Sequence, residues 1–342
     1  MNLSDYDFHL PDELIAQEPQ TRRDQSRLLV LDRSDGQIHH LHFYDVVKII
    51  RPADVLIVNE TRVFPARLYG VRSDTGGKVE VLLIRQVAEG RWLAMGKPAR
   101  ALQLGRKLTF AGGALDAEVT ARREDGRVEL GFGAEDLTAI LNEIGEIPLP
   151  PYIRRSPTAQ DEERYQTVFA RQQGAIAAPT AGLHFTNTLM DDLRRDGTGI
   201  QPILLHVGPG TFEPVRSDDP RLHRIEAEYY EVSSESAEEI NRRRAAGGRA
   251  IAVGTTSVRA LETAVDERGV VRDLSGWTEA FIHPPYEFGV VDVLITNFHL
   301  PQSTLLMLVA AFAGYENLMR AYEEAVRENY RFYSYGDAMM VV

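Results

Sequence analysis

The sequence predicts an α/β protein: an α/β sheet domain with an inserted small antiparallel β-barrel domain. Short apolar runs that alternate with helix-like segments are typical of a sheet covered by helices. Between residues 67 and 132 the pattern changes to short runs separated by glycine-containing turns, which is typical of a small barrel. At 342 residues the chain is longer than a single hydrophobic core usually supports, so two domains are expected. We therefore expect a discontinuous α/β domain, residues 1–61 and 151–342, and a barrel domain, residues 62–150.

Each element of this architecture has a local signal. The six barrel strands are expected in ARLYGVR, KVEVLLIR, RWLAMGK, RKLTF, DAEVTARR and RVELGF. The proline-rich connector IPLPPYIRR interrupts both periodicities and indicates the exit from the barrel. Buried strands of the α/β domain are expected at 54–59, 174–179, 200–207, 249–254 and 291–297, and helices at 161–171, 186–195, 234–246 and 303–313.

Composition excludes several classes of protein. The chain has no cysteine, which excludes a disulfide framework, a thiolate metal site and a cysteine nucleophile. The first residues lack the basic and apolar regions of a signal peptide. The longest apolar stretch, 305–313, is far shorter than the roughly 20 residues that a membrane span needs. We expect a cytoplasmic protein without a membrane partner and, because no oligomerisation surface stands out, a monomer.

The charge is unevenly distributed. A net charge of −12 argues against indiscriminate binding of nucleic acid. Residues 62–155, however, contain 15 basic and 12 acidic residues. If a nucleic acid binds, this segment is its expected platform, and Lys97, Arg100, Arg106 and Lys107 are the expected phosphate contacts. Ordinary surface charge is the alternative.

Four junctions between a predicted strand and the loop or helix that follows it contain polar or aromatic side chains. The residues singled out are His184 and Phe185; His206, Phe212 and Glu213; Thr255, Thr256, Ser257 and Arg259; and Asn297 and His299. The strands of α/β sheets gather ligands at their carboxyl ends, so we expect these residues to surround one site.

The residue types at these junctions suggest specific roles. His184 and His206 are candidates for proton transfer near neutral pH, although a structural role explains either one taken singly. Phe185 and Phe212 can hold a base or a cation. The predicted helix start at 255–257 suits a carboxylate or phosphate.

Several familiar chemistries lack their motifs. We find neither a glycine-rich dinucleotide fingerprint nor a phosphate loop. His184, His206 and His299 could together hold a metal, but no short-range pair of ligands supports such a site, and we expect none. His40 and His42 have the spacing of two ligands on one strand face, yet an exposed β hairpin is the more economical interpretation.

Long strings resemble one family. MNLSDYDFHLPDELIAQEP, VLIVNETRVFPARL, GEIPLPPYI, RYQTVFA, AAPTAGLHFT, LHVGPGTFEPV, VGTTSVRALE, TNFHLPQSTLLMLVAAFAG and YRFYSYGDAMM resemble the S-adenosylmethionine:tRNA ribosyltransferase-isomerases of queuosine biosynthesis. The resemblance runs from residue 1 to residue 342. It implies an α/β domain with an inserted barrel.

The resemblance also implies a reaction. The ribosyl part of S-adenosylmethionine moves to 7-aminomethyl-7-deazaguanine at the wobble position of tRNA, giving epoxyqueuosine-tRNA, adenine and methionine. S-adenosylmethionine is then a consumed co-substrate, and no tightly bound cofactor is expected.

For this reaction the residues take expected roles. His184 and His206 supply the acid and the base, in unassigned order. Glu213, Phe185 and Phe212 lie near the sulfonium, and the helix start at 255–257 holds the methionine carboxylate. Two alternatives stay open: a non-catalytic RNA-binding module, and an unrelated nucleoside or sugar-phosphate enzyme that uses the anion site at Thr255.

Overall fold

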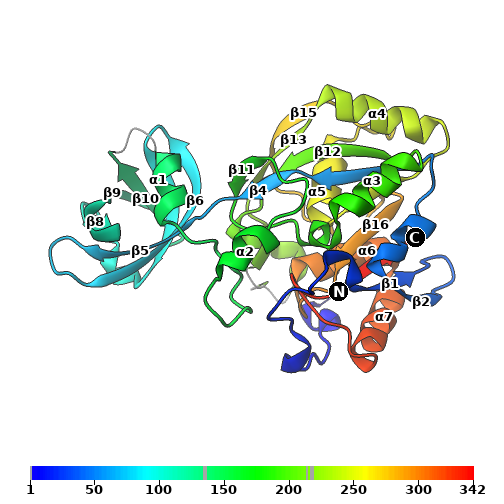
Figure 1. Ribbon diagram of the computed structural model, residues 1–342, viewed down its shortest axis with the longest axis horizontal. Helices are drawn as coiled ribbons and strands as arrows, with labels where there is room; N and C mark the ends of the chain where they lie inside the picture. Colours follow the sequence, from blue (N-terminus) through cyan, green and yellow to red (C-terminus); the bar gives the residue numbers. More distant parts are fainter. Residues whose placement is uncertain (1, 134–136, 213–214, 216–218) are drawn as a thin grey trace.

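The computed structural model describes residues 2–133, 137–212, 215 and 219–342, and it has two lobes (Figure 1). The larger lobe is built on a nine-stranded sheet, and the smaller lobe is a closed six-stranded barrel. The predicted fold class, an α/β sheet domain with an inserted antiparallel barrel, is confirmed. The limits of the two domains, residues 62 and 150, stay a prediction.

Four parallel strands form the centre of the large sheet. In spatial order they are β12 (Gly199–Leu205), β3 (Val55–Asn59), β14 (Ala250–Val253) and β16 (Val293–Asn297). One edge continues with the antiparallel strands β13 (Glu228–Val232) and β15 (Leu274–Thr278), and the other with β17 (Ala338–Val341), β1 (Arg27–Leu31) and β2 (Ile38–His42). Because the central strands are parallel, their carboxyl ends meet at one edge of the sheet.

Helices cover both faces of this sheet. Val55 and Ile57 of β3 pack into one core, whereas Leu56 and Val58 pack into another, as the alternation of a strand requires. The first core contains residues of α4 (Ser234–Ala245), α5 (Thr255–Ala264), α6 (Thr304–Ala313) and α7 (Tyr315–Arg327). The second contains residues of α3 (Asn187–Arg195) and of the 3-10 helix η4 (Phe43–Lys48). Among the helices that the structure describes, none is long and apolar enough to cross a membrane.

The barrel has its own core. All six predicted strands are present, as β5 (Arg67–Arg72), β6 (Lys78–Ala88), β7 (Arg91–Lys97), β8 (Lys107–Phe110), β9 (Leu115–Arg122) and β10 (Val128–Phe132). They close in the order β10-β7-β6-β5-β8-β9. Inward side chains such as Leu68, Val81, Leu108 and Leu130 are buried together. The helix α1 (Leu137–Ile144) follows the barrel in sequence, and its Leu141 packs into the same core.

Two predicted elements differ from the structure. The strand expected at 174–179 is the shorter β11 (Gln172–Ala175), which pairs with β4 (Thr61–Val63) in a separate two-stranded sheet. The helix expected at 161–171 is α2 (Ala159–Arg164). It ends there because Gln166 uses its side-chain amide to bond both backbone groups of Val63, at 3.0 and 2.8 Å. This long-range contact replaces the next helical turn.

Candidate functional site

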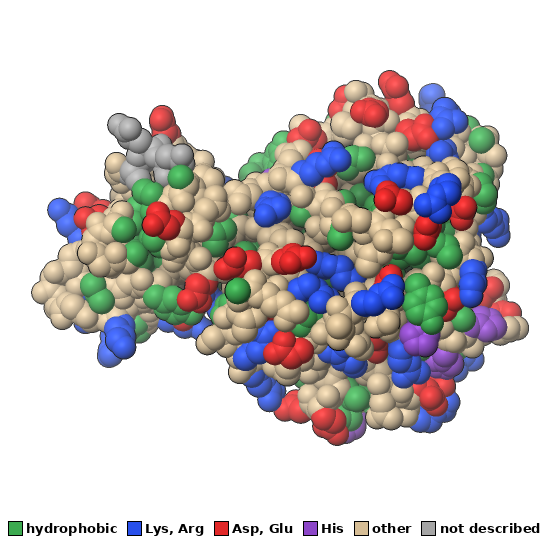
Figure 2. All heavy atoms as spheres, in the orientation of Figure 1, with side chains coloured by type: hydrophobic (Ala, Val, Ile, Leu, Met, Phe, Trp, Pro, Cys, Tyr) green, Lys and Arg blue, Asp and Glu red, His purple; other side chains and the backbone are tan. Residues whose placement is uncertain are grey.

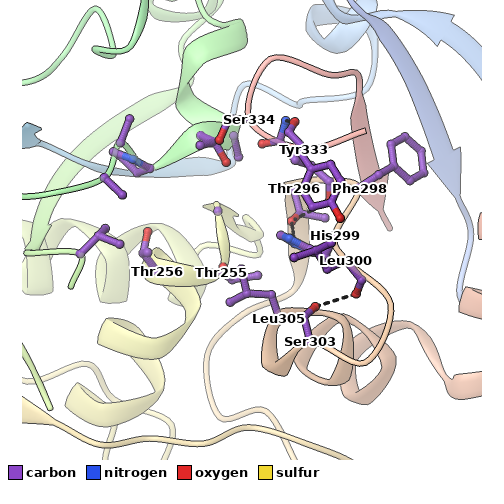
Figure 3. A pocket seen from close by; sticks show the side chains of 18 of the residues that line it. Thr255, Thr256, Thr296, Phe298, His299, Leu300, Ser303, Leu305, Tyr333 and Ser334 are labelled. Carbon is purple, nitrogen blue, oxygen red and sulfur yellow. Dashed lines mark hydrogen bonds between the residues drawn. The ribbon is translucent and has the colours of Figure 1, made fainter. Parts of the chain in front are cut away.

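A cavity opens at the carboxyl ends of β14 and β16 (Figure 3). Its walls come from separate parts of the chain: Tyr152, residues 177–181, Val207, residues 254–256, residues 296–300, Ser303, Leu305, Tyr333 and Ser334. Of the residues predicted to form the site, the structure brings Thr255, Thr256, Asn297 and His299 to this cavity.

The first turn of α5 forms one wall. Gly254 precedes it with φ 91°, a left-handed conformation that glycine adopts without steric cost. Thr256 is fixed from behind, because its Oγ1 accepts a hydrogen bond from Asn59 Nδ2 at 3.2 Å, and the same amide donates to the carbonyl of Leu205 at 2.9 Å. The free N–H groups of a helix start favour an anion. The predicted anion site therefore lies in the wall of the cavity, and anion binding itself stays a prediction.

Ser257, by contrast, is occupied within the helix. Its hydroxyl donates to the carbonyl of Val253 at 2.8 Å, and the residue is fully buried. The structure therefore places it beneath the helix start, outside the residues that line the cavity.

Two aromatic rings that the sequence analysis did not single out form another wall. Tyr152 and Tyr333 stack with their ring centroids 4.3 Å apart. The Tyr152 hydroxyl lies 2.6 Å from the hydroxyl of Ser334. Tyr333 has φ 71°, an unfavourable conformation for a bulky residue, and the described residues give its buried hydroxyl no hydrogen-bond partner. The one available signal was the tyrosine-rich string YRFYSYGD.

Asn297 ends β16 at the cavity. Its Nδ2 lies 3.1 Å from the carbonyl oxygen of Tyr333, 3.5 Å from that of Asp337 and 3.1 Å from Nε2 of His184. Its Oδ1 is buried and has no hydrogen-bond partner among the described residues. A buried acceptor left without a donor is unusual in a folded protein, and it marks this atom as a candidate for ligand binding.

His184 lies behind Asn297 and outside the residues that line the cavity. It ends the 3-10 helix η7 (Thr180–His184), and its Nδ1 lies 2.7 Å from Ser26 Oγ. Burial, together with the nearby charges of Arg23 and Arg331, lowers the pKa of His184 to about 3. With both ring nitrogens bonded, this geometry favours a positioning role for His184 over the predicted proton transfer.

His206 and His299 have different surroundings. His206 follows β12, is partly exposed, and its Nδ1 lies 2.8 Å from Thr61 Oγ1. Burial lowers its pKa. His299 lines the cavity, with its Nε2 2.8 Å from Thr296 Oγ1, and burial lowers its pKa to about 3. Among the described residues there is no group of three or more His, Asp or Glu side chains that could hold a metal.

Two residues that were predicted to contact a ligand make their contacts inside the protein instead. Phe185 is completely buried, and its ring packs edge-on against Phe43 with the centroids 4.9 Å apart, so it serves the core and not a ligand. Arg259 forms a buried ion pair with Glu228 and donates from Nε to the carbonyl of Ala280 at 2.9 Å. The side chain of Phe212 and the whole of Glu213 lie outside the described residues.

The four predicted phosphate contacts lie on the barrel. Lys97, Arg100 and Lys107 are exposed, whereas Arg106 is partly buried and pairs with Asp74 at 2.6 Å. On the face in Figure 2, basic side chains are more numerous over the larger lobe than over the barrel. A phosphate-binding role for these four residues stays a prediction.

A cavity at the carboxyl ends of parallel strands, with a helix start on one wall and stacked tyrosines on another, is the arrangement of an α/β protein with a candidate small-molecule site. The chain belongs to the family described as queuosine biosynthesis protein, whose model matches residues 3–341. The family resemblance seen in the sequence is thereby confirmed.

Two relatives agree with this family. The chain is 48% identical over 343 residues to an S-adenosylmethionine:tRNA ribosyltransferase-isomerase of Desulforamulus reducens, and the match covers 100% of both chains. It is 38% identical to the S-adenosylmethionine tRNA ribosyltransferase of Thermotoga maritima, whose crystal structure superposes with a TM-score of 0.57. That match covers 99% of this chain and 100% of the other.

Proposed function

We propose that this chain transfers and isomerises the ribosyl part of S-adenosylmethionine onto 7-aminomethyl-7-deazaguanine at the wobble position of tRNA. The products are epoxyqueuosine-tRNA, adenine and methionine. The single observation that carries the proposal is the 48% identity over the whole chain to a protein of this name. S-adenosylmethionine is a consumed substrate in this proposal.

The cavity supports this assignment, because its walls offer separate surfaces for the two ends of the substrate. The start of α5, with Thr255 and Thr256, suits the methionine carboxylate. The stacked rings of Tyr152 and Tyr333 suit the flat face of adenine. His206 is the group that we propose for proton transfer, because it is partly exposed and adjoins the cavity residue Val207.

The proposed function is tested by mixing the protein with S-adenosylmethionine and tRNA that carries the deazaguanine precursor. Adenine and methionine are then measured by liquid chromatography. We expect both products in equal amounts, and only when that tRNA is present. Binding without release would instead indicate an RNA-binding module, and a methylated tRNA would overturn the proposal.

The tRNA platform on the barrel gives a second prediction. Replacing Lys97, Arg100, Arg106 and Lys107 with Ala weakens tRNA binding. The slope of log affinity against log salt concentration becomes shallower by about 0.7 for each lost phosphate contact. The experiment measures this slope. Lys78→Ala, which removes another exposed charge of the barrel, is the matched control and leaves the slope unchanged. An unaltered slope in the quadruple variant would show that tRNA binds to another surface of the protein.

A further inference from the structure

We infer that Asn297 Oδ1 accepts a hydrogen bond from the 6-amino group of adenine, and that His184 and Ser26 hold this amide in place instead of transferring protons. The inference rests on the proposed function, which makes S-adenosylmethionine the ligand. It assigns Asn297 as a specificity-determining residue and His184 as a positioning residue.

The orientation of the Asn297 amide follows from its neighbours. Two backbone carbonyl oxygens, of Tyr333 and Asp337, lie 3.1 and 3.5 Å from the same amide atom. A carbonyl oxygen can only accept, so that atom must be the nitrogen. Oδ1 therefore points away from these two carbonyl oxygens, and it has no hydrogen-bond partner among the described residues. Asn297 as a whole is 1% exposed.

The histidine behind the amide is held in one tautomer. Asn297 donates to His184 Nε2 at 3.1 Å, so the ring proton is on Nδ1. Nδ1 then donates to Ser26 Oγ at 2.7 Å, and Ser26 donates to the carbonyl of Arg23 at 3.3 Å. Every donor in this chain points away from the cavity. The chain needs a neutral imidazole, which agrees with the low pKa of His184 that burial produces.

The surroundings of Oδ1 indicate which donor it takes. Asn297 lines the cavity together with Tyr333, whose ring stacks on Tyr152. An aromatic surface beside an unpaired amide acceptor suits a purine that has an exocyclic amino group. Figure 3 shows Tyr333 on one side of the cavity and Thr256, at the start of α5, on the other. The adenine end and the methionine end of one substrate would therefore occupy separate walls.

The test compares ligands by isothermal titration calorimetry. S-adenosylmethionine is compared with an analogue that has hydrogen in place of the adenine 6-amino group. We expect the wild-type protein to prefer S-adenosylmethionine by about 10- to 100-fold, because the analogue leaves Oδ1 unpaired. In Asn297→Ser this preference falls below about threefold. Ser26→Ala is a second variant, for use if Asn297→Ser does not fold. It leaves Asn297 in place but removes the group that holds His184, and we expect it to reduce the preference for S-adenosylmethionine.

Kinetics separate positioning from proton transfer. For His184→Phe, whose ring cannot accept from Asn297, we expect the KM for S-adenosylmethionine to rise more than kcat falls. The limbs of the pH profile stay where they are in the wild type. His40→Phe is the matched control, because His40 is an exposed histidine bonded to Tyr330 at 2.8 Å, and it changes neither constant.

Four outcomes would overturn the inference. If the wild-type protein binds both ligands equally well but still releases adenine, the inference is wrong and the proposed function stands. A lost limb in the pH profile of His184→Phe would make His184 a proton-transfer group. Asn297→Ser could keep the preference for the 6-amino group and instead lose the preference for S-adenosylmethionine over an analogue without the methionine α-amino group. That result would assign Oδ1 to the ammonium. No binding of S-adenosylmethionine at all would overturn both this inference and the proposed function.

Discussion

Replacing Glu228 with Ala lowers the free energy of unfolding by about 3–5 kcal/mol, because the change leaves the Arg259 guanidinium buried without a carboxylate. The two side chains are 3% and 5% exposed, so water cannot replace the lost partner. Glu228 also accepts a hydrogen bond from the backbone of Gly208 at 2.8 Å, which ties the pair to the loop after β12. Arg259 is fixed in turn by the carbonyl of Ala280.

Urea unfolding followed by circular dichroism measures this effect. Asp191→Ala is the matched control, because it removes a carboxylate from an exposed pair with Arg194, whose side chains are 63% and 57% exposed. Exposed pairs contribute about 0–1 kcal/mol, so the control unfolds near the wild-type midpoint. A loss in Glu228→Ala as small as that in the control would show that the buried pair does not stabilise the fold.

The same ion pair shows why the contacts of Arg259 could not be predicted from the sequence. Arg259 lies one turn into α5, beside the helix start that the sequence predicts to bind an anion. Its actual partner is on β13, 31 residues away in sequence, and no local pattern indicates that pairing. The burial of Phe185 could not be predicted either, because the ring of Phe43 that packs against it comes from a distant segment.

Other parts of the molecule were predictable because their signals are local. The barrel strands are short runs between glycine-containing turns, and all six formed as expected. Thr255 follows the buried strand β14 and Asn297 ends the buried strand β16, and the parallel pairing of these strands brings the two residues to one cavity. The stacking of Tyr152 on Tyr333 joins the proline-rich connector to the last loop of the chain, so the sequence alone could not reveal that wall.

Replacing His206 with Ala lowers the rate of adenine release by about 10²- to 10⁴-fold, the usual contribution of a general acid or base. Three observations favour the role of base. The ring is partly exposed, and its Nδ1 is oriented by Thr61 at 2.8 Å. Burial also lowers its pKa, so the ring is neutral and able to accept a proton at pH 7.

The pH dependence gives this prediction its sign. A base acts when it is deprotonated, so the rate rises as the pH increases through the pKa of His206. Because burial lowers that pKa, the acidic limb of the profile lies below the ordinary histidine value of about 6.5. In His206→Ala this limb disappears, whereas His40→Ala, at an exposed histidine, leaves the profile unchanged. A His206→Ala variant that keeps both the rate and the acidic limb would assign the proton transfer to another group, and His299 in the cavity wall would then be the next residue to replace.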